Sequence, residues 1–469
     1  MWTGSISRRA HSHREGRSTK TWPSSLSEIQ ENVLDRVRPG QPDRKRIADT
    51  SASIIARVED LARARGLPLQ AMLVGSAARG TWLSGDHDLD IFLAVPPEES
   101  LAAALDVAKI AAPHYEEKYA EHAYIHARMD GFEVDLVPCY LVDDASHLKS
   151  AVDRTPFHTI YVSRKIVGKE DDVLLLKQFM KGVGVYGSEL KVGGFSGYLA
   201  ELLVLSYGSF SEVLRAASSW RPGLRLDLEG HGTERHNEPL IMVDPVDPKR
   251  NVAAALTLDR MLQFAVAARS FLAGPKIEFF FPPPLPPLSD EQIIAELNSR
   301  ETMPILIDFA APDVVEDVLY PQLRKAEGSI GALLERNGFC MLRSDVFTYR
   351  DRAVMLFEMQ VWQLSKACRR IGPPAWEAEH VARFLAAHPH PFSGPYIAGG
   401  KVVVEEARQH TSARDLLSCQ IASLSLGKHL HASICRGHNI YVGQEILGIE
   451  DEGFRVFLAQ FFSARVRTG

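Results

Sequence analysis

The stretch MLVGSAARGTWLSGDHDLDIFL (residues 72–93) decides the fold of the first part of this chain. Apolar residues predict a strand over 70–74 that stops at a Gly-Ser pair, and a second strand over 88–95. Asp88 and Asp90 stand two apart on the second strand, so both carboxylates point to one face. Because a buried charge is costly unless it is paired or binds a metal, these acids mark a candidate site.

A third acid lies in the same apolar setting further along the chain. Asp130-Gly131 is a strong hairpin signal between two more predicted strands, and Asp135 stands in the middle of the second one. If that strand lies beside the strand with the acid pair, all three carboxylates converge. Three hard oxygen ligands on a rigid sheet suit Mg²⁺ better than zinc, so we predict that the three acids are catalytic metal ligands.

The break in the opening stretch predicts a phosphate site. Gly75 lets the backbone approach a ligand closely, and a helix starting at about Ala77 would direct its free N–H groups toward the turn. Ser76 could add a hydroxyl group and Arg79 a guanidinium group. A phosphate cradle that faces metal-binding carboxylates suits nucleotidyl transfer, in which metal ions bridge the phosphates and activate an incoming hydroxyl.

The rest of the chain predicts a multi-domain α+β protein. A mixed domain is followed by a mostly helical region, and the segment FFFPPPLPPLSD (279–290) then predicts a stiff connector, because its prolines cannot sit inside a helix or a central strand. Four segments are expected: a basic arm over 1–24, a catalytic domain over 25–155, a helical central domain over 156–275, and a mixed α/β C-terminal region over 276–469.

Composition excludes several classes of protein. The chain has 469 residues and a formal net charge of −6, so any nucleic acid would be bound by a local basic patch rather than by bulk charge. The five cysteines form no CxxC pair, which favours the reducing cytoplasm. No apolar run approaches the roughly 20 residues that a membrane span needs, so no membrane association is expected.

Four stretches together resemble a known family. VGSAARGTWLSGDHDLDIFL, RTPFH, LLKQFMKGVGVYGSELKVGGFSGYLAELLVLSYGSF and DPVDPKRNVAAAL are similar to the archaeal-type, class I CCA-adding enzymes. These are tRNA nucleotidyltransferases with a DNA polymerase β-like catalytic head. The resemblance covers residues 25–469 and is most specific in the first 270 or so. The basic arm is additional to the family pattern. The resemblance implies that the helical central domain contacts the nucleotide base and RNA, and that the C-terminal region is a tRNA-binding body and tail.

The resemblance implies an activity and roles for particular residues. The enzyme would add C, C and A to the 3′ end of tRNA from CTP and ATP, without a nucleic-acid template. The acids at 88, 90 and 135 would bind Mg²⁺. The nucleotide-binding roles implied by the family pattern are a triphosphate contact for Gly75, Ser76, Arg79, His158 and Lys177, positioning of the triphosphate for Tyr186, and choice between C and A for Arg250.

Taken one at a time, the last four of these residues have plainer interpretations. Lys177 and Lys181 share a helix face that could simply be solvated, and Tyr186 could be an aromatic residue of a turn. His158 at a helix start could be a cap, and Arg250 a surface residue. For tRNA itself, we predict a basic stripe that contacts the acceptor stem, formed by Lys165, Lys169, Lys181 and Lys191.

Two other functions stay open from the sequence. One is another RNA nucleotidyltransferase of the same superfamily, such as a poly(A) polymerase or an oligoadenylate synthase. The other is an inactive RNA-binding protein on the same scaffold, although three converging carboxylates would serve no purpose there. Whether the protein forms a homodimer, and which C-terminal residues contact tRNA, is also left open.

Overall fold

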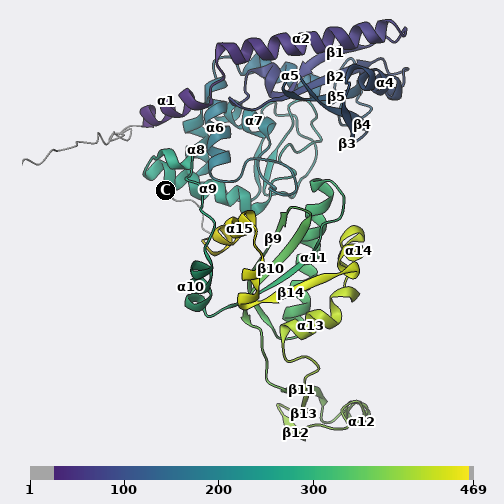
Figure 1. Ribbon diagram of the computed structural model, residues 1–469, viewed down its shortest axis with the longest axis vertical. Coiled ribbons are helices and arrows are strands. Elements are labelled where there is room, and N and C mark those ends of the chain that lie inside the picture. Colours follow the sequence, from purple (N-terminus) through teal and green to yellow (C-terminus); the bar gives the residue numbers. More distant parts are fainter. Residues whose placement is uncertain (1–25, 464–469) are drawn as a thin grey trace, which may run out of the picture.

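The computed structural model describes residues 26–463, so the predicted basic arm lies outside the described part. The molecule is elongated, with the N-terminal and central regions packed together at one end and a small lobe at the other (Figure 1). Helices and sheets are both abundant, which confirms the multi-domain α+β prediction. No helix within 26–463 is both long and apolar enough to cross a membrane.

The catalytic region contains a five-stranded sheet in the order β1-β2-β5-β4-β3. Two helices, α2 (Gln41–Arg63) and α4 (Leu101–Ala111), pack their apolar side chains against the sheet. The predicted strands over 70–74 and 88–95 are both confirmed. The strands are β1 (Gln70–Val74), β2 (Asp88–Val95), β3 (Tyr115–Tyr119), β4 (Ala123–Met129) and β5 (Phe132–Tyr140).

Strand β3 is not predicted from the sequence. Its sequence YEEKY is polar and mostly exposed, so no alternation of apolar residues marks it. It forms an edge of the sheet and pairs only with β4. The predicted hairpin between β4 and β5 is confirmed, and both turn residues, Asp130 and Gly131, have the positive φ angles that such a tight turn needs.

The helical region has one large apolar core, built around Phe179. The core contains the helices α5 (Arg154–Lys165), α6 (Glu170–Gly182), α7 (Gly197–Tyr207), α8 (Phe210–Ala217) and α9 (Leu258–Ala273), together with the short strands β6 (Leu224–Leu226) and β7 (Leu240–Met242). Five other phenylalanine rings surround Phe179 at centroid distances of 5.4–6.0 Å. This core supports the floor of the site described below.

Two boundaries differ from the predicted ones. Helix α1 (Leu26–Val37) was assigned to the catalytic domain, but its buried residues pack into the core of the helical region. The predicted connector is also only partly a connector. Phe279 and Phe280 are buried in that core, at the end of the short helix η1 (Ile277–Phe279), and only the prolines after them form an extended link. In both cases the burial of apolar side chains places the segment in the helical region.

The C-terminal region contains two units. The first is a four-stranded sheet in the order β14-β8-β10-β9, covered by helices, and the second is a three-stranded sheet in the order β11-β13-β12 with one helix. The first contains α10 (Asp290–Arg300), β8 (Met303–Ala310), α11 (Glu316–Arg336), β9 (Cys340–Tyr349), β10 (Arg352–Val361), α13 (Ala413–Gln420), η2 (Ile421–Ser423), α14 (Lys428–Arg436), β14 (His438–Val442), η3 (Gly443–Gly448) and α15 (Glu452–Phe462).

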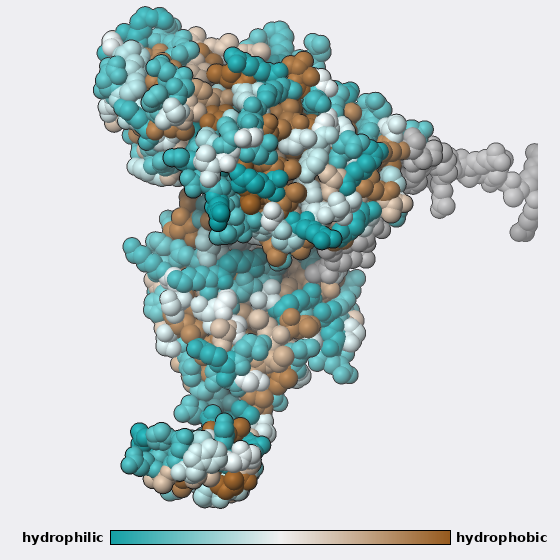
Figure 2. Space-filling view, turned by 180° about the vertical axis from the view of Figure 1, so that it is seen from behind, coloured by the Kyte–Doolittle hydropathy of each residue, from teal (hydrophilic) through white to brown (hydrophobic). Residues whose placement is uncertain are grey.

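The small unit forms the lobe at the far end of the molecule (Figures 1 and 2). It contains β11 (Ala367–Pro374), α12 (Ala378–Ala387), β12 (Ser393–Ala398) and β13 (Lys401–Ala407). Its core is thin, because helix α12 has no buried residue. Large apolar side chains stay exposed on it, among them Trp376 at 78%. Figure 2 shows apolar surface on this lobe, at a distance from the catalytic sheet.

Candidate active site

The acid residues meet on two adjacent strands of the catalytic sheet. Strands β2 and β5 pair in parallel, and the register places Asp90 directly beside Asp135 and Asp88 beside Glu133. The predicted neighbourhood of the two strands is therefore confirmed. Asp90 and Asp135 line one cavity, whereas Asp88 lies exposed at the first residue of its strand.

The acids are electrostatically strained as a group. Burial raises the pKa of Asp90 to about 6, and the negative charges of Asp135 and Asp88 add to the effect. Arg79 opposes the shift but does not cancel it. Although Asp88 is exposed at the surface, partial desolvation by the surrounding chain also raises its pKa, with further contributions from nearby acids. Arg79 and Lys181 only partly offset the shifts of Asp90 and Asp88, which leaves a setting that a bound metal cation would relieve.

Within residues 26–463, no three His, Cys, Asp or Glu side chains are arranged closely enough to hold a metal ion as they stand. Asp135 is instead bound to a residue that the sequence analysis missed, His126, whose Nδ1 lies 2.6 Å from Asp135 Oδ1. The hairpin register pairs these two residues. Counting outward from the two-residue turn, where Met129 pairs with Phe132, would have identified His126 from the sequence.

The Gly-Ser turn is shaped around the acid beside it. Gly75 has φ +71°, and a Cβ atom at this position would overlap Oδ2 of Asp90. Glycine is therefore required both by the backbone conformation and by the space that the carboxylate takes. The helix α3 (Gly75–Arg79) begins two residues earlier than predicted and has only five residues. Ser76 lies half-buried on it, outside the cavity lining.

Two predicted phosphate-binding cations meet at one buried carboxylate. Arg79 Nε lies 3.0 Å from Glu201, and Lys177 Nζ lies 3.9 Å from the same side chain. Lys177 also donates a hydrogen bond of 2.8 Å to the carbonyl of Thr81. Burial lowers the pKa of Lys177 to about 8. Glu201, on α7, was not singled out in the sequence, although an acid within the apolar run YLAELLVL (198–205) carries the same signal as Asp88 and Asp90.

Tyr186 lies beside these cations. A Cβ atom added to Gly197 would stand 3.0 Å from the Tyr186 hydroxyl and 3.4 Å from Lys177 Nζ, so the glycine leaves room for both groups. Burial raises the pKa of Tyr186, which keeps its hydroxyl protonated as a donor. Lys181 Nζ lies 5.4 Å from the centre of the tyrosine ring.

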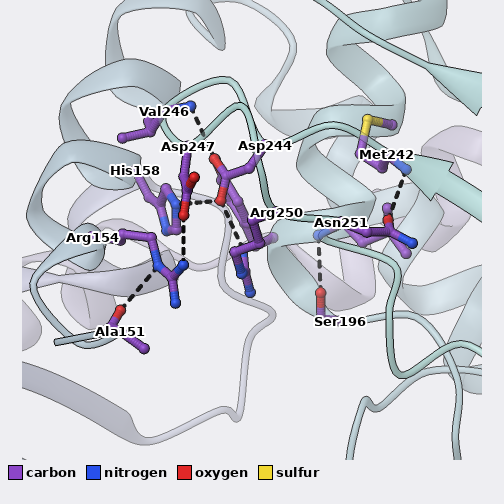
Figure 3. A network of polar contacts seen from close by, with 12 residues as sticks. Ala151, Arg154, His158, Ser196, Met242, Asp244, Val246, Asp247, Arg250 and Asn251 are labelled. Carbon is purple, nitrogen blue, oxygen red and sulfur yellow. Dashed lines mark hydrogen bonds and ion pairs between the residues drawn. The ribbon is translucent and has the colours of Figure 1, made fainter. Parts of the chain in front are cut away.

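On the opposite wall, His158 and Arg250 converge on Asp244 (Figure 3). His158 Nε2 and Arg250 Nη1 each lie 2.8 Å from Asp244 Oδ2. Burial lowers the pKa of His158, and its ring stacks on Tyr198 with centroids 4.3 Å apart. Burial alone would raise the pKa of Asp244, but its hydrogen bonds and the charges of His158 and Arg250 hold it well below its usual value.

A cavity of about 580 Å³ joins these walls. Six predicted residues line it: Gly75, Arg79, Asp90, Asp135, His158 and Arg250. Four others do not line it, because Asp88 lies at the strand start, Ser76 on the short helix, and Lys177 and Tyr186 behind the wall. Further lining residues were not predicted, among them Tyr124, Arg154, Ser196 and Tyr198. Aromatic and hydroxyl side chains have too many structural roles to be recognised from sequence.

The predicted basic stripe is not a row of unpaired cations. Each of the four lysines has a nearby partner: Lys165 pairs with Glu229, Lys169 with the carbonyl of Gly208, Lys181 with Asp86, and Lys191 with Glu316. Lys181 lies close to the acids, so its charge acts on Asp88. Lys191 reaches α11 and links the helical region to the C-terminal region.

Models of three protein families match successive parts of the chain. A nucleotidyltransferase domain matches residues 55–158, the second domain of tRNA nucleotidyltransferases matches 171–281, and the C-terminal domain of CCA-adding enzymes matches 300–443. The catalytic sheet and its acids thus form a nucleotidyltransferase domain, a class of domain that implies a divalent metal cation.

Relatives identify the family within this class. The CCA-adding enzyme of Methanosarcina acetivorans is 45% identical over 440 residues, which cover 92% of this chain and 97% of the relative. That of Methanosarcina barkeri is 43% identical over 453 residues, covering 94% and 100%. The chain belongs to the family of CCA-adding enzymes. Solved structures are more remote: a Cid1 poly(U) polymerase covers 55% of this chain and 99% of its own at 14% identity, with a TM-score of 0.42.

Proposed function

We propose that this protein adds C, C and A in sequence to the 3′ end of tRNA, using CTP and ATP and no nucleic-acid template. The observation that carries the proposal is the register of Asp90 beside Asp135 in a cavity that His158 and Arg250 also line. Membership of the family supplies the substrate, and the cavity supplies a place where carboxylates, cations and a base-reading arginine face one nucleotide.

The metal is proposed to be Mg²⁺, held by Asp88, Asp90 and Asp135. The donor set fits it, since all three groups offer hard oxygen ligands, and desolvation together with repulsion between neighbouring acids raises the pKa of Asp88 and Asp90. When bound, the cation would neutralise phosphate charge and favour loss of the proton from the RNA 3′-hydroxyl. His126 orients the Asp135 carboxylate through its 2.6 Å contact.

The nucleotide is proposed to lie along the cavity, with its triphosphate toward Gly75, Ser76 and Arg79. Lys177 lies buried behind this wall, so it contributes positive charge rather than an exposed contact. Tyr186 lies near Lys177, beside the space that Gly197 leaves open. From the opposite wall, His158 would reach across the cavity to phosphate oxygens. Arg250 on that wall would read the base edge, because a planar guanidinium can form paired hydrogen bonds.

The proposed domain roles follow from these positions. The catalytic region holds the metal and phosphates, and the helical region holds the base. The two C-terminal units would contact the body of tRNA. The protein is proposed to act in the cytoplasm, in keeping with its five free cysteines.

A primer-extension experiment tests the activity. A tRNA that ends at the discriminator base is incubated with Mg²⁺ and labelled CTP, ATP or both. We expect two C additions with CTP alone, and one A only after both Cs. Unlimited A addition without CTP would instead indicate a poly(A) polymerase. Binding of tRNA without any incorporation would indicate an inactive RNA-binding protein.

A further inference from the structure

Asp244 is the most thoroughly bound carboxylate of the helical region, and its side chain is 0% exposed. Besides His158 and Arg250 on Oδ2, its Oδ1 accepts hydrogen bonds from the Val246 N–H at 3.0 Å and from the Tyr198 hydroxyl at 3.3 Å. Donors from a helix, from a neighbouring helix and from its own loop therefore end on one carboxylate. Figure 3 shows it between the His158 ring and the Arg250 guanidinium.

The backbone closes the same loop. The Asp244 N–H donates to the carbonyl of Arg250 at 3.0 Å, and the Arg250 N–H donates to the carbonyl of Asp247 at 3.0 Å. Asp247 in turn accepts a hydrogen bond of 2.7 Å from Arg154. The segment from 244 to 250 is thus a closed loop, with its first and last residues joined through both backbone and side chain.

Arg250 lies between this loop and the cavity. Its side chain is 35% exposed, and it lines the cavity while one nitrogen is held by Asp244. A guanidinium can distinguish bases only if its fork is held at a fixed angle, since the paired hydrogen bonds are strongly directional. An arginine with no partner would lose rotamer freedom when a base binds, and the selection would weaken.

We infer that Asp244 is a positioning residue that sets the angle of Arg250 toward the base and, through the same oxygen, the orientation of His158 toward the phosphates. It acts through these two residues and itself touches no substrate. The inference rests on the proposed function, because the base-selecting role of Arg250 belongs to that proposal. As a consequence, the selection of the base by Arg250 and the contact of His158 with the phosphates both depend on the Asp244 carboxylate.

The test measures nucleotide choice rather than activity alone. Full-length Asp244→Asn, Arg250→Ala and the double variant are given tRNA ending in C or in CC, and kcat/KM is measured for CTP and for ATP on each. Asparagine keeps the volume of aspartate but removes the charge and one accepting oxygen. We expect Asp244→Asn to lower the ratio of correct to incorrect addition by about tenfold. The double variant should then be no less selective than Arg250→Ala, because Asp244 acts through Arg250.

The matched control is Glu358→Gln, which alters an equally buried, arginine-bound carboxylate in the C-terminal sheet. It should leave the ratio unchanged. An unchanged ratio in Asp244→Asn, or additive losses in the double variant, would overturn the inference. If Arg250→Ala keeps full selectivity, the base-selecting role is wrong and the inference fails with it. If Arg250→Ala loses selectivity and Asp244→Asn keeps it, only the inference fails.

Should Asp244→Asn not fold, Tyr198→Phe decides the question. This change removes the hydroxyl that donates to Asp244 Oδ1 and keeps the ring that stacks on His158. A smaller fall in the same ratio, of about twofold to threefold, supports the inference, since a single long hydrogen bond is lost. A ratio equal to that of the unaltered protein contradicts it.

Discussion

Two sheets of this molecule bury an acid on a central strand, and they treat it in opposite ways. In the C-terminal sheet, Glu358 on β10 is bound by Arg300 at 2.6 Å, Arg343 at 2.8 Å and Thr302 at 2.6 Å. Burial would raise the pKa of Glu358, but these hydrogen bonds together lower it. In the catalytic sheet, Asp90 stands beside Asp135, and its pKa is raised to about 6.

The difference separates an acid that the protein itself neutralises from an acid of the proposed metal site. Glu358 is neutralised by the protein itself, and Asp308 on β8 is likewise bound at both oxygens by Arg352. Asp90 keeps the repulsion of Asp135 and Asp88, which Arg79 only partly opposes, so its charge is left for the proposed metal to neutralise. A site that must bind a cation gains affinity from this, at a cost in the stability of the metal-free fold.

The largest effect is expected for Asp90→Asn. We expect nucleotide incorporation to fall by at least about a thousandfold, because a ligand of the proposed metal loses its charge. The metal-free protein should melt at the same temperature or higher, since a repelling buried charge is removed. Primer extension and thermal unfolding in EDTA measure the two effects. Loss of tRNA binding to the same degree would mean that Asp90 is a structural acid after all.

The second test is Gly75→Ala, which acts on Asp90 from outside. A methyl group would overlap the carboxylate and would strain a backbone with φ +71°. We expect incorporation to fall by about a hundredfold, through displacement of Asp90 or of the turn. Gly66→Ala is the matched control, because Gly66 has φ +68° but nothing within 4 Å of its added Cβ atom. Equal losses of activity in both variants would show that backbone strain alone is responsible.

The third test is Glu358→Gln, which alters the acid that the protein itself neutralises. It leaves two arginines without their shared carboxylate, and we expect the free energy of unfolding of the C-terminal sheet to fall by about 3 kcal/mol. With saturating tRNA at 25 °C, the rate of C addition should change by less than about twofold. Urea unfolding and primer extension measure these quantities. A large loss of rate with an intact fold would show that Glu358 has a role in the reaction and is not only a structural acid.

The smallest effect concerns pH. The pKa of Glu358 is lower in the folded protein than in the unfolded chain, so its stabilisation is present at neutral pH and is lost as the pH falls through the folded value. The difference in stability between the unaltered protein and Glu358→Gln should therefore shrink as the pH is lowered from 7 toward 3. Urea midpoints across this range measure it. A difference that widens on acidification contradicts the sign.

Much of the catalytic region could be predicted from sequence because its signals are local. The strands at 70–74 and 88–95 coincide with apolar runs, and the pair Asp130-Gly131 is by itself a strong signal for a hairpin turn. Boundaries that depend on distant packing could not be found in the same way. Helix α1 is amphipathic in either setting, and nothing within it says which core its apolar face will join.

The residues of the site also fall into those that local sequence signals identify and those that only distant packing brings together. The sequence by itself determined which acids share a strand face, where the turn beside them lies and which family they resemble, because strand periodicity and turn chemistry depend only on neighbouring residues. Only the tertiary structure decided that Glu201 gathers Arg79 and Lys177, and that Asp244 gathers His158 and Arg250. These contacts join residues 24 to 122 positions apart, or close a loop whose shape depends on its surroundings, so they exist only once the helical core has formed.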